Sequence, residues 1–340
     1  MTGNRIHPAE VLFDGEQETP ILPPVDHYAG AEKLIRKAMA LQAELGPIFD
    51  ITCDCEDGAA AGHEHKHAQM CARLIASQDN LHGRMGARIH DPRHPHWHRD
   101  LEILLGDAGN RIAFITLPKP LSAGDVARQI DALDTLRHRH GIAQAIRVHV
   151  LIETHGALRE CWQIAAMPGV ESLDFGLMDF VSAHRGAIPA SAMRSPGQFE
   201  HPLIARAKTE IAAAALANGA VPSHNVTTEL KDVDLIGSDA RTARQSFGFL
   251  RMWSIHPNQI LPIAAAMRAD DEEIQIACRI LALAQDAAWG PIRDQGRLHD
   301  RASYRYFWDL LARAERAGAK LDADTRSRFF ELGTQTTVGA

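Results

Sequence analysis

Short apolar or β-branched runs alternate with segments of helical spacing along most of this chain. We expect strands at eight of these runs, namely Val11 to Phe13, Phe49 to Asp54, Gly86 to Ile89, Ile112 to Leu117, Arg147 to Ile152, Leu173 to Gly176, His224 to Val226 and Trp253 to Ile255. This alternation is typical of parallel βαβ units in α/β proteins. Eight strands favour a closed (β/α)8 TIM barrel with a C-terminal helical extension, and a doubly wound open sheet is the alternative.

The pattern changes after Gln259, where only segments of helical spacing follow. We therefore expect a barrel over residues 1–262 and a C-terminal helical extension over residues 263–340. The stretch from Gly290 to Arg301 is rich in Gly, Pro, Arg and Asp, which predicts a mobile flap at about residues 290–301. A chain of 340 residues with 45% hydrophobic content can bury a core of this size.

Charge and hydropathy exclude several classes of partner. A net charge of −7 leaves no general cationic surface for a phosphate backbone, so we expect no nucleic acid partner. No signal or transit peptide stands out, and no stretch approaches the ~18 apolar residues of a membrane-spanning helix, so we expect no membrane. The five cysteines form an odd, scattered set, which predicts reduced thiols in a cytoplasmic protein.

Ionisable side chains follow five consecutive expected strands, and in a barrel the carboxyl ends of all strands share one rim. A single carboxylate at such a place is more often a helix cap or a solvated loop residue. Charges beside apolar strand ends cost desolvation, however, unless they serve each other or a ligand. The set therefore predicts an active site built from Asp54, Glu56, Asp57, Arg88, Lys119, Glu153 and Asp179.

Glu153 and Asp179 offer hard carboxylate oxygens from neighbouring strands, a donor set that suits Mg²⁺, with Mn²⁺ as a substitute. Such an ion can chelate the carboxylate and carbonyl oxygens of an α-keto acid and polarise the carbonyl group. Arg88 supplies a permanently charged fork for an enolate oxygen or a carboxylate. These three residues predict metal-dependent making or breaking of a carbon–carbon bond beside a carboxylate.

Other motifs give no competing chemistry. His63, His65 and His67 alternate in GHEHKH, but residues at i and i+2 do not share a helix face, so a helix start is favoured over a zinc site. The chain carries no dinucleotide fingerprint, P-loop or nucleophile-elbow motif. Dehydrogenase and hydrolase functions therefore have no support.

Taken in order, these segments resemble the citrate lyase β-subunit and malyl-CoA lyase (HpcH/HpaI aldolase) family of metal-dependent lyases, from about Phe49 to Ala317. CDCEDGAA looks like the acidic DLED segment of that family, GARIH like its arginine strand and TLPKP like its LPK turn. LIETHG and FGLMDF are similar to its metal-binding segments, and SIHPNQI matches its IHPxQ segment.

The resemblance implies a role for each residue of the expected rim. Glu153 and Asp179 would bind Mg²⁺, and Arg88 would stabilise an enolate. Glu56 and Asp57 would organise Arg88 and the waters of the metal.

The resemblance also implies roles for three further residues. Lys119 and His256 would support substrate binding. Asp300, in QGRLHDRASY, stands where the family carries a flap aspartate that reaches into a neighbouring subunit as acid or base. The alternative for Asp300 is a helix N-cap. A shared site would require a homo-oligomer, which the resemblance implies is a trimer or a multiple of trimers.

Some segments depart from the family pattern. EVLFDGEQETP lacks the arginine associated with coenzyme A contacts, and His90 replaces an asparagine. The bulky Arg251 and Met252 stand where the family favours glycine and lysine. We expect a Mg²⁺-dependent carbon–carbon lyase acting on a β-hydroxyacyl (malyl- or citryl-type) CoA thioester and releasing a keto acid such as glyoxylate or oxaloacetate. The alternatives are a CoA-independent aldolase on free hydroxy-keto acids and, more distantly, a non-catalytic dicarboxylate-binding protein.

Overall fold

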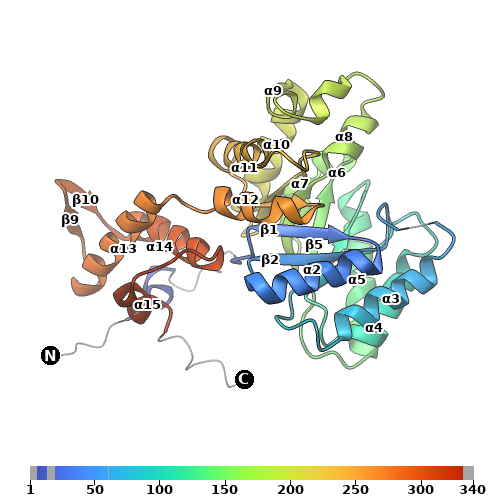
Figure 1. Ribbon diagram of the computed structural model, residues 1–340, viewed down its shortest axis with the longest axis horizontal. Helices are drawn as coiled ribbons and strands as arrows, with labels where there is room; N and C mark the ends of the chain where they lie inside the picture. Colours follow the sequence, from blue (N-terminus) through green and yellow to red (C-terminus); the bar gives the residue numbers. More distant parts are fainter. Residues whose placement is uncertain (1–5, 14–19, 60, 332–340) are drawn as a thin grey trace. The chain divides into compact units, whose positions relative to one another are not determined.

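The computed structural model describes residues 6–13, 20–59 and 61–331, and the chain divides into two compact units (Figure 1). One unit is Leu22–Met267, and the other joins Met1–Ile21 with Arg268–Ala340. The expected boundary after residue 262 falls inside helix α12 (Pro257–Met267), and the N-terminal residues group with the C-terminal ones.

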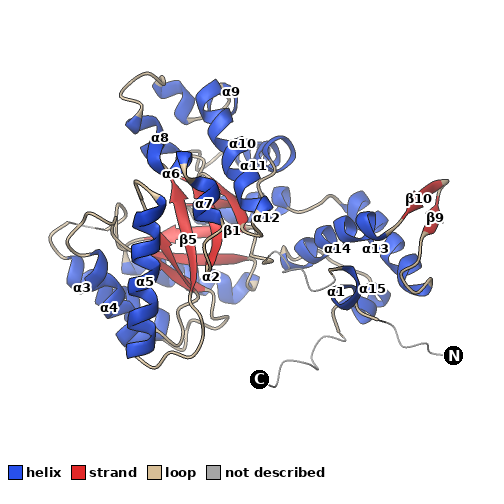
Figure 2. Ribbon diagram, turned by 180° about the vertical axis from the view of Figure 1, so that it is seen from behind, coloured by secondary structure: helices blue, strands red, loops and turns tan. Residues whose placement is uncertain are grey.

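The unit Leu22–Met267 is a closed barrel of eight parallel strands in chain order, ringed by helices (Figure 2), which confirms the predicted (β/α)8 fold. The doubly wound alternative is wrong, because β1 pairs with β8 through Val25 and Met252. The strands are β1 Val25–Ala29, β2 Phe49–Asp54, β3 Met85–Arg88, β4 Phe114–Leu117, β5 Arg147–Ile152, β6 Val170–Phe175, β7 Val221–His224 and β8 Arg251–Ser254.

Three helices of this unit, α5, α6 and α11, begin at a residue whose side chain caps them. Ser122 accepts a hydrogen bond from the backbone N–H of Asp125 at the start of α5, and Asp232 caps α11 in the same way. The helices are α2 Glu32–Leu45, α3 Glu64–Ala76, α4 Trp97–Ala108, α5 Ala123–Arg139, α6 His155–Arg159, α7 Cys161–Ala165, α8 Leu177–Ala183, α9 Gly197–Glu200, α10 Pro202–Ala217, α11 Val233–Phe247 and α12, with a 3-10 turn at Ala190–Met193.

The first strand is not where the sequence predicted it. Val11 and Leu12 belong to helix α1 (Pro8–Leu12), which begins with a proline and is capped by His7, and Phe13 ends it. The first barrel strand is β1 (Val25–Ala29), in which Asp26 and His27 interrupt the apolar run. The prediction was wrong because this strand buries polar side chains.

The inner face of the barrel is largely polar and its outer face is apolar. Alternate residues of a strand point to opposite faces, so outward residues such as Ile51, Val150 and Phe175 pack in the main core with the helices. Most TIM barrels fill their interior with branched apolar residues. Here the inward set is mostly polar and buried, and it includes Asp26, Asp50, Thr52, Thr116, His149, Ser172, Asp174, Ser223 and Arg251.

One apolar layer crosses this polar interior. Tyr28 of β1, Leu151 of β5 and Trp253 of β8 form a cluster of their own, and the rings of Tyr28 and Trp253 stack with centroids 4.5 Å apart. Because β1 and β5 are not neighbours in the sheet, their contact runs across the barrel. This layer separates the rim above from the deeper polar residues.

The second unit has its own core of buried residues, among them Leu12, Leu281, Tyr304, Trp308 and Phe329. The stretch predicted as a flap contains an antiparallel hairpin, which turns at Gln295 and Gly296 with positive φ. The elements of this second unit after α1 are α13 Asp271–Asp286, β9 Ile292–Asp294, β10 Arg297–His299, α14 Arg301–Arg316 and α15 Ala323–Phe329. None of the described helices of the chain is both long and apolar enough to cross a membrane.

Candidate active site

Arg88 ends β3 and faces Asp54, which ends the neighbouring strand β2 at the paired register position. Its Nε and Nη2 donate to the two carboxylate oxygens of Asp54 at 2.8 and 2.6 Å, and both side chains are buried. Burial would raise the pKa of Asp54, but the charge and hydrogen bonds of Arg88 outweigh it and lower that pKa. The Arg88 fork is therefore held rigidly at the rim.

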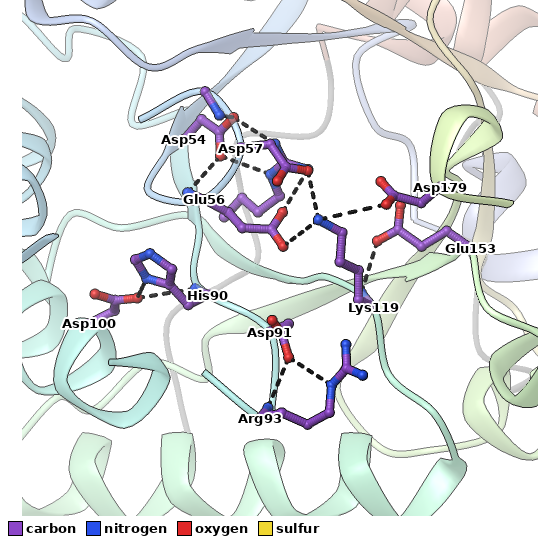
Figure 3. A network of polar contacts seen from close by, with 12 residues as sticks. Asp54, Glu56, Asp57, His90, Asp91, Arg93, Asp100, Lys119, Glu153 and Asp179 are labelled. Atoms are coloured by element: carbon purple, nitrogen blue, oxygen red, sulfur yellow. Dashed lines mark hydrogen bonds and ion pairs between the residues drawn. The ribbon is translucent and has the colours of Figure 1, made fainter. Parts of the chain in front are cut away.

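Glu56, Asp57 and Lys119 extend this pair into a network (Figure 3). Lys119 Nζ lies 2.9 Å from Glu56 and 2.7 Å from Asp57, and Arg88 Nη1 lies 3.1 Å from Glu56. Burial raises the pKa of Glu56 despite both cations. The network fixes the two positive charges of the site beside each other, with Asp57 at its exposed edge.

Lys119 also fixes Glu153 through its backbone. Its φ of 49° lies in the left-handed region that non-glycine residues rarely adopt, and its N–H donates to Glu153 Oε1 at 2.8 Å. Backbone strain of this kind occurs where the surrounding structure enforces a functional geometry. The turn after β4 thus orients the carboxylate that ends β5.

Glu153 and Asp179 fit a divalent cation. Glu153 is 2% exposed, and burial, followed by the charge of Asp179, raises its pKa to about 8. A buried carboxylate beside a second carboxylate is costly unless a cation compensates them. Lys119 Nζ is 3.8 Å from Asp179, whereas within the described residues Glu153 accepts a hydrogen bond only from the Lys119 backbone N–H. Their oxygens form the hard donor set that Mg²⁺ prefers.

Two glycines make room for the carboxylates of this site. A Cβ at Gly176 would lie 2.0 Å from Glu153 Oε2, and one at Gly58 would lie 2.3 Å from Asp54 Oδ2. Real Cβ atoms essentially never come so close. Glycine at these positions therefore leaves room for the carboxylates of Glu153 and Asp54.

Sequence reasoning missed Tyr28, and it placed Asp54 at the rim without identifying Arg88 as its partner. Asp54 stood in the acidic segment, but its partnership with Arg88 depends on the register of β2 and β3. Tyr28 lies with its ring 5.5 Å from the Arg88 guanidinium, a cation–π contact. It lies on the strand that the sequence analysis misplaced, so no signal pointed to it.

His90 forms a buried pair with Asp100 of α4 near this network (Figure 3). Both its Nδ1 and its backbone N–H contact Asp100 Oδ2, at 2.6 and 3.1 Å. Burial would lower the pKa of His90, but the hydrogen bond and charge of Asp100 raise it overall. A titratable ring thus lies two residues beyond Arg88.

In the barrel unit, the structure brings six predicted residues together with Asp54, and His256 lies outside their network. Glu56, Asp57, Arg88, Lys119, Glu153 and Asp179 share contacts or a neighbouring charge. His256 accepts a hydrogen bond from the N–H of Asn258 and, within the described residues, has no hydrogen bond or ion pair with this network. Asp300 belongs to the other unit and caps α14, as its alternative interpretation expects. Its role in proton transfer stays a prediction.

Known proteins share this architecture and much of the sequence, although no protein-family model matches the chain. A citrate lyase from Burkholderia xenovorans LB400 is 53% identical, covers 95% of this chain and all of its own, and superposes with a TM-score of 0.83. L-malyl-CoA/β-methylmalyl-CoA lyase from Cereibacter sphaeroides is 29% identical over 79% of this chain and 88% of its own length.

A third relative, the protein CitE from Mycobacterium tuberculosis, was solved in complex with magnesium, acetoacetate and coenzyme A. It is 24% identical over 87% of this chain and 98% of its own, with a TM-score of 0.65, which shows the common fold. The Burkholderia protein matches over its whole length at more than half of the aligned positions. The chain therefore belongs to the citrate lyase β-subunit and malyl-CoA lyase family of carbon–carbon lyases.

Proposed function

We propose that this protein is a Mg²⁺-dependent lyase that cleaves a malyl- or citryl-type β-hydroxyacyl-CoA thioester into a keto acid and an acyl-CoA, or catalyses the reverse condensation. The observation that carries the proposal is the buried Glu153, with a raised pKa, beside Asp179 on the rim that also holds the fixed Arg88 fork. This rim combines a cation site with a permanent positive charge, the two features that a keto acid and an enolate require.

Glu153 and Asp179 would hold the Mg²⁺. When bound, the ion supplies Lewis-acid polarisation of the keto-acid carbonyl and a fixed position for its carboxylate. Asp57 and the buried Glu56 lie next to this position, because both contact Lys119 Nζ, which is 3.8 Å from Asp179. Glu56 Oε2 is buried and forms an ion pair with Arg88 Nη1 at 3.1 Å, but it has no hydrogen-bond partner within the described residues, so a lone pair can accept from a bound water.

Arg88 would bind the oxygen on which negative charge develops. A guanidinium has five N–H donors, and Asp54 takes two of them. In the condensation, a base removes a proton from the α-carbon of the acyl thioester, and Arg88 stabilises the resulting enolate oxygen. The enolate carbon then forms a bond to the keto carbon, the C=O π electrons move to the keto oxygen, and that oxygen takes up a proton from water to become the product hydroxyl. Cleavage runs through the same species in reverse, and the hydroxyl returns its proton to water.

Asp300 is our candidate for the base. Its position in the family pattern supports this assignment, and in the condensation its carboxylate would take the α-proton and return it during cleavage. Because Asp300 lies in the second unit, we propose that it serves the barrel of a neighbouring copy in a homo-oligomer, a trimer or a multiple of trimers. Lys119 and His256 would contact the substrate.

A direct assay tests the proposal. Purified protein with Mg²⁺ should release glyoxylate from malyl-CoA or oxaloacetate from citryl-CoA, and Mn²⁺ should replace Mg²⁺. Glu153→Gln should reduce kcat/KM by about 10³ or more, because it removes a metal ligand. Unchanged turnover in Glu153→Gln, or turnover in EDTA, would show that the reaction does not require the metal.

One observation favours the CoA-independent aldolase as a second candidate. β1 and the residues 20–24 before it contain no arginine or lysine that could pair with the phosphates of coenzyme A. Comparing malyl-CoA with free 4-hydroxy-2-keto acids at equal concentration separates the two functions. Turnover of the free acids alone would establish the second candidate.

A further inference from the structure

A second group of ionisable side chains lies inside the barrel, one layer below the candidate active site. Asp26, His149 and Arg251 each precede by two positions a member of the Tyr28, Leu151 and Trp253 layer, so they lie deeper on the same inner face. Asp174 of β6 joins them, and all four residues have no exposed surface. This group takes no part in the chemistry proposed above.

Three of these side chains converge. Asp26, His149 and Asp174 each offer one ligand atom, and these atoms lie within 4.8 Å of one another. Asp26 Oδ2 and His149 Nδ1 are 3.9 Å apart. Within the described residues, Asp26 Oδ2, His149 Nδ1 and Asp174 Oδ2 are buried without a hydrogen-bond partner, although Asp26 Oδ2 lies 3.5 Å from Arg251 Nη2 in an ion pair. Buried polar atoms nearly always have a partner, so three such atoms at one point indicate a bound species.

The remaining polar atoms of the same three side chains are anchored. Thr52 donates to Asp26 Oδ1 at 2.7 Å, and Ser172 donates to Asp174 Oδ1 at 2.5 Å. His149 Nε2 lies 3.3 Å from Glu171 Oε2, which favours the tautomer with a lone pair on Nδ1. Histidines that bind metals characteristically donate their other ring nitrogen to a carboxylate in this way.

The charge of the interior also calls for a cation. Arg84 binds Asp50 through two hydrogen bonds, and Arg251 lies 2.8 Å from Asp50 and 3.5 Å from Asp26. When His149 is neutral, the two guanidinium groups supply two positive charges. The carboxylates of Asp26, Asp50, Glu171 and Asp174 supply four negative charges, so two negative charges remain unbalanced. One divalent ion would balance this excess, and an unbalanced buried charge is expensive.

We propose that Asp26, His149 and Asp174 form a structural metal site that holds one divalent transition-metal ion, with Zn²⁺ as the best match. One imidazole nitrogen and two carboxylate oxygens suit zinc better than magnesium, which prefers oxygen alone. Ligand atoms around tetrahedral zinc lie about 3.4 Å apart, so the 3.9 Å separation of Asp26 and His149 needs only a small contraction. The ion would enter before the barrel closes and would then resist chelators.

Metal analysis tests this site on protein made in zinc-supplemented medium. A Glu153→Gln, Asp179→Asn, Cys71→Ser background removes the magnesium ligands and also breaks the cluster of Cys55, His67 and Cys71, whose ligand atoms lie within 4.8 Å of one another. Metal retained after dialysis against EDTA then reports on the interior site. We expect one equivalent of zinc per chain. Adding Asp174→Asn should reduce this below about 0.1 equivalent, because a ligand is lost. Thr116→Val is the matched control, since Thr116 pairs with His149 in register, is nearly isosteric with valine and is no ligand.

Crystals of the unmutated protein supply a readout that does not depend on the folding of any variant. An anomalous difference peak at the zinc absorption edge between Asp26, His149 and Asp174 would establish the site. Less than about 0.1 equivalent of zinc in the folded background protein would overturn the proposal. A peak that behaves as water at this position, or full zinc retention in folded Asp174→Asn protein, would also overturn it.

Discussion

At the residue scale, Arg88 is the most closely held group of the candidate site. Asp54 binds it in two places, Glu56 contacts its third nitrogen, and the Tyr28 ring lies beside the guanidinium plane. Each partner removes some freedom from the arginine side chain, so little ordering is required when a substrate oxygen arrives. This arrangement predicts that the partners of Arg88 matter for stability as well as for turnover.

Asp54→Asn should lower the free energy of unfolding by about 3 kcal/mol, because it leaves the buried Arg88 charge without its main partner. Urea denaturation followed by circular dichroism measures this loss. Asp57→Asn is the control: Asp57 is 56% exposed and 4.0 Å from Arg88, so its loss should cost less than about 1 kcal/mol. Equal losses in the two variants would contradict this account of Arg88.

Mg²⁺ should raise the melting temperature of the protein, because it binds the folded state at carboxylates that are otherwise uncompensated. Glu153→Gln should abolish this rise. In buffer without metal, at a pH above about 8 where Glu153 is ionised, the same variant should be at least as stable as the unmutated protein, since it removes a buried charge. Differential scanning calorimetry with and without Mg²⁺ compares the two proteins, and a normal Mg²⁺ response in the variant would exclude Glu153 as a ligand.

The pair of His90 and Asp100 predicts a pH-dependent contribution to stability. The folded state raises the pKa of His90 above that of an unfolded histidine, so folding favours the protonated ring. The contribution is therefore complete below the unfolded pKa of about 6.5 and is lost as the pH rises through the folded pKa. The urea midpoint difference between the unmutated protein and His90→Asn should be larger at pH 6 than at pH 9. A constant difference would show that the ring does not gain charge on folding.

At the scale of elements, the turns after the strands carry the geometry of the site. The turn after β4 places the N–H of Lys119 on Glu153, and Gly176 at the end of β6 leaves room for the same carboxylate. These turns follow strands that hold their register through buried apolar outer faces. The fold therefore fixes Glu153 from two neighbouring connections.

Gly176→Ala should displace Glu153, because the new Cβ would overlap its Oε2, Cβ and Cδ atoms. We expect a loss of Mg²⁺ affinity of about tenfold or more, with an unchanged circular dichroism spectrum. Gly124→Ala is the control, since its nearest neighbour would be Ser122 Oγ at an ordinary 3.6 Å. Isothermal titration with Mg²⁺ compares them, and equal affinities would show that Glu153 does not need this space.

The elements also show what the sequence could and could not predict. The apolar outer faces of β2 and β5 made them visible as strands, and the rim residues could be found because they directly follow such strands. β1 was missed because its inward Asp26 breaks the apolar run. The hydrogen-bond partner of Asp26 is Thr52 of the neighbouring strand, which the sequence of β1 alone does not reveal. The partnership of Asp54 with Arg88 depends on register, which a single sequence does not contain.

At the scale of the whole molecule, the chain divides its proposed machinery between two units. The carboxylates and Arg88 lie in the barrel unit, whereas Asp300 caps a helix of the other unit. The family resemblance assigns Asp300 to a neighbouring copy, and this part of the site could be predicted only by that likeness. A mixture of two inactive variants tests whether the units of different copies cooperate.

Glu153→Gln and Asp300→Ala chains should each be inactive alone. Coexpressed in equal amounts, they should recover about a quarter of the normal activity, because random assembly pairs an intact barrel with an intact Asp300 in that fraction of sites. Size-exclusion chromatography of the mixture checks that hybrid oligomers form. Hybrids without recovered activity would place Asp300 outside the neighbour's site.

Arg251 has a consequence for how this protein is made. It belongs to the last strand, yet it binds Asp50 of β2, 201 positions earlier. This contact stabilises the closed barrel at the place where β8 pairs with β1. Until the ribosome has delivered that arginine, Asp26 and Asp50 face each other on an open sheet without one of their two cations, and two strand edges stay unpaired. Closure must therefore come late in synthesis, and a nascent chain that ends before β8 is the form that chaperones would have to protect.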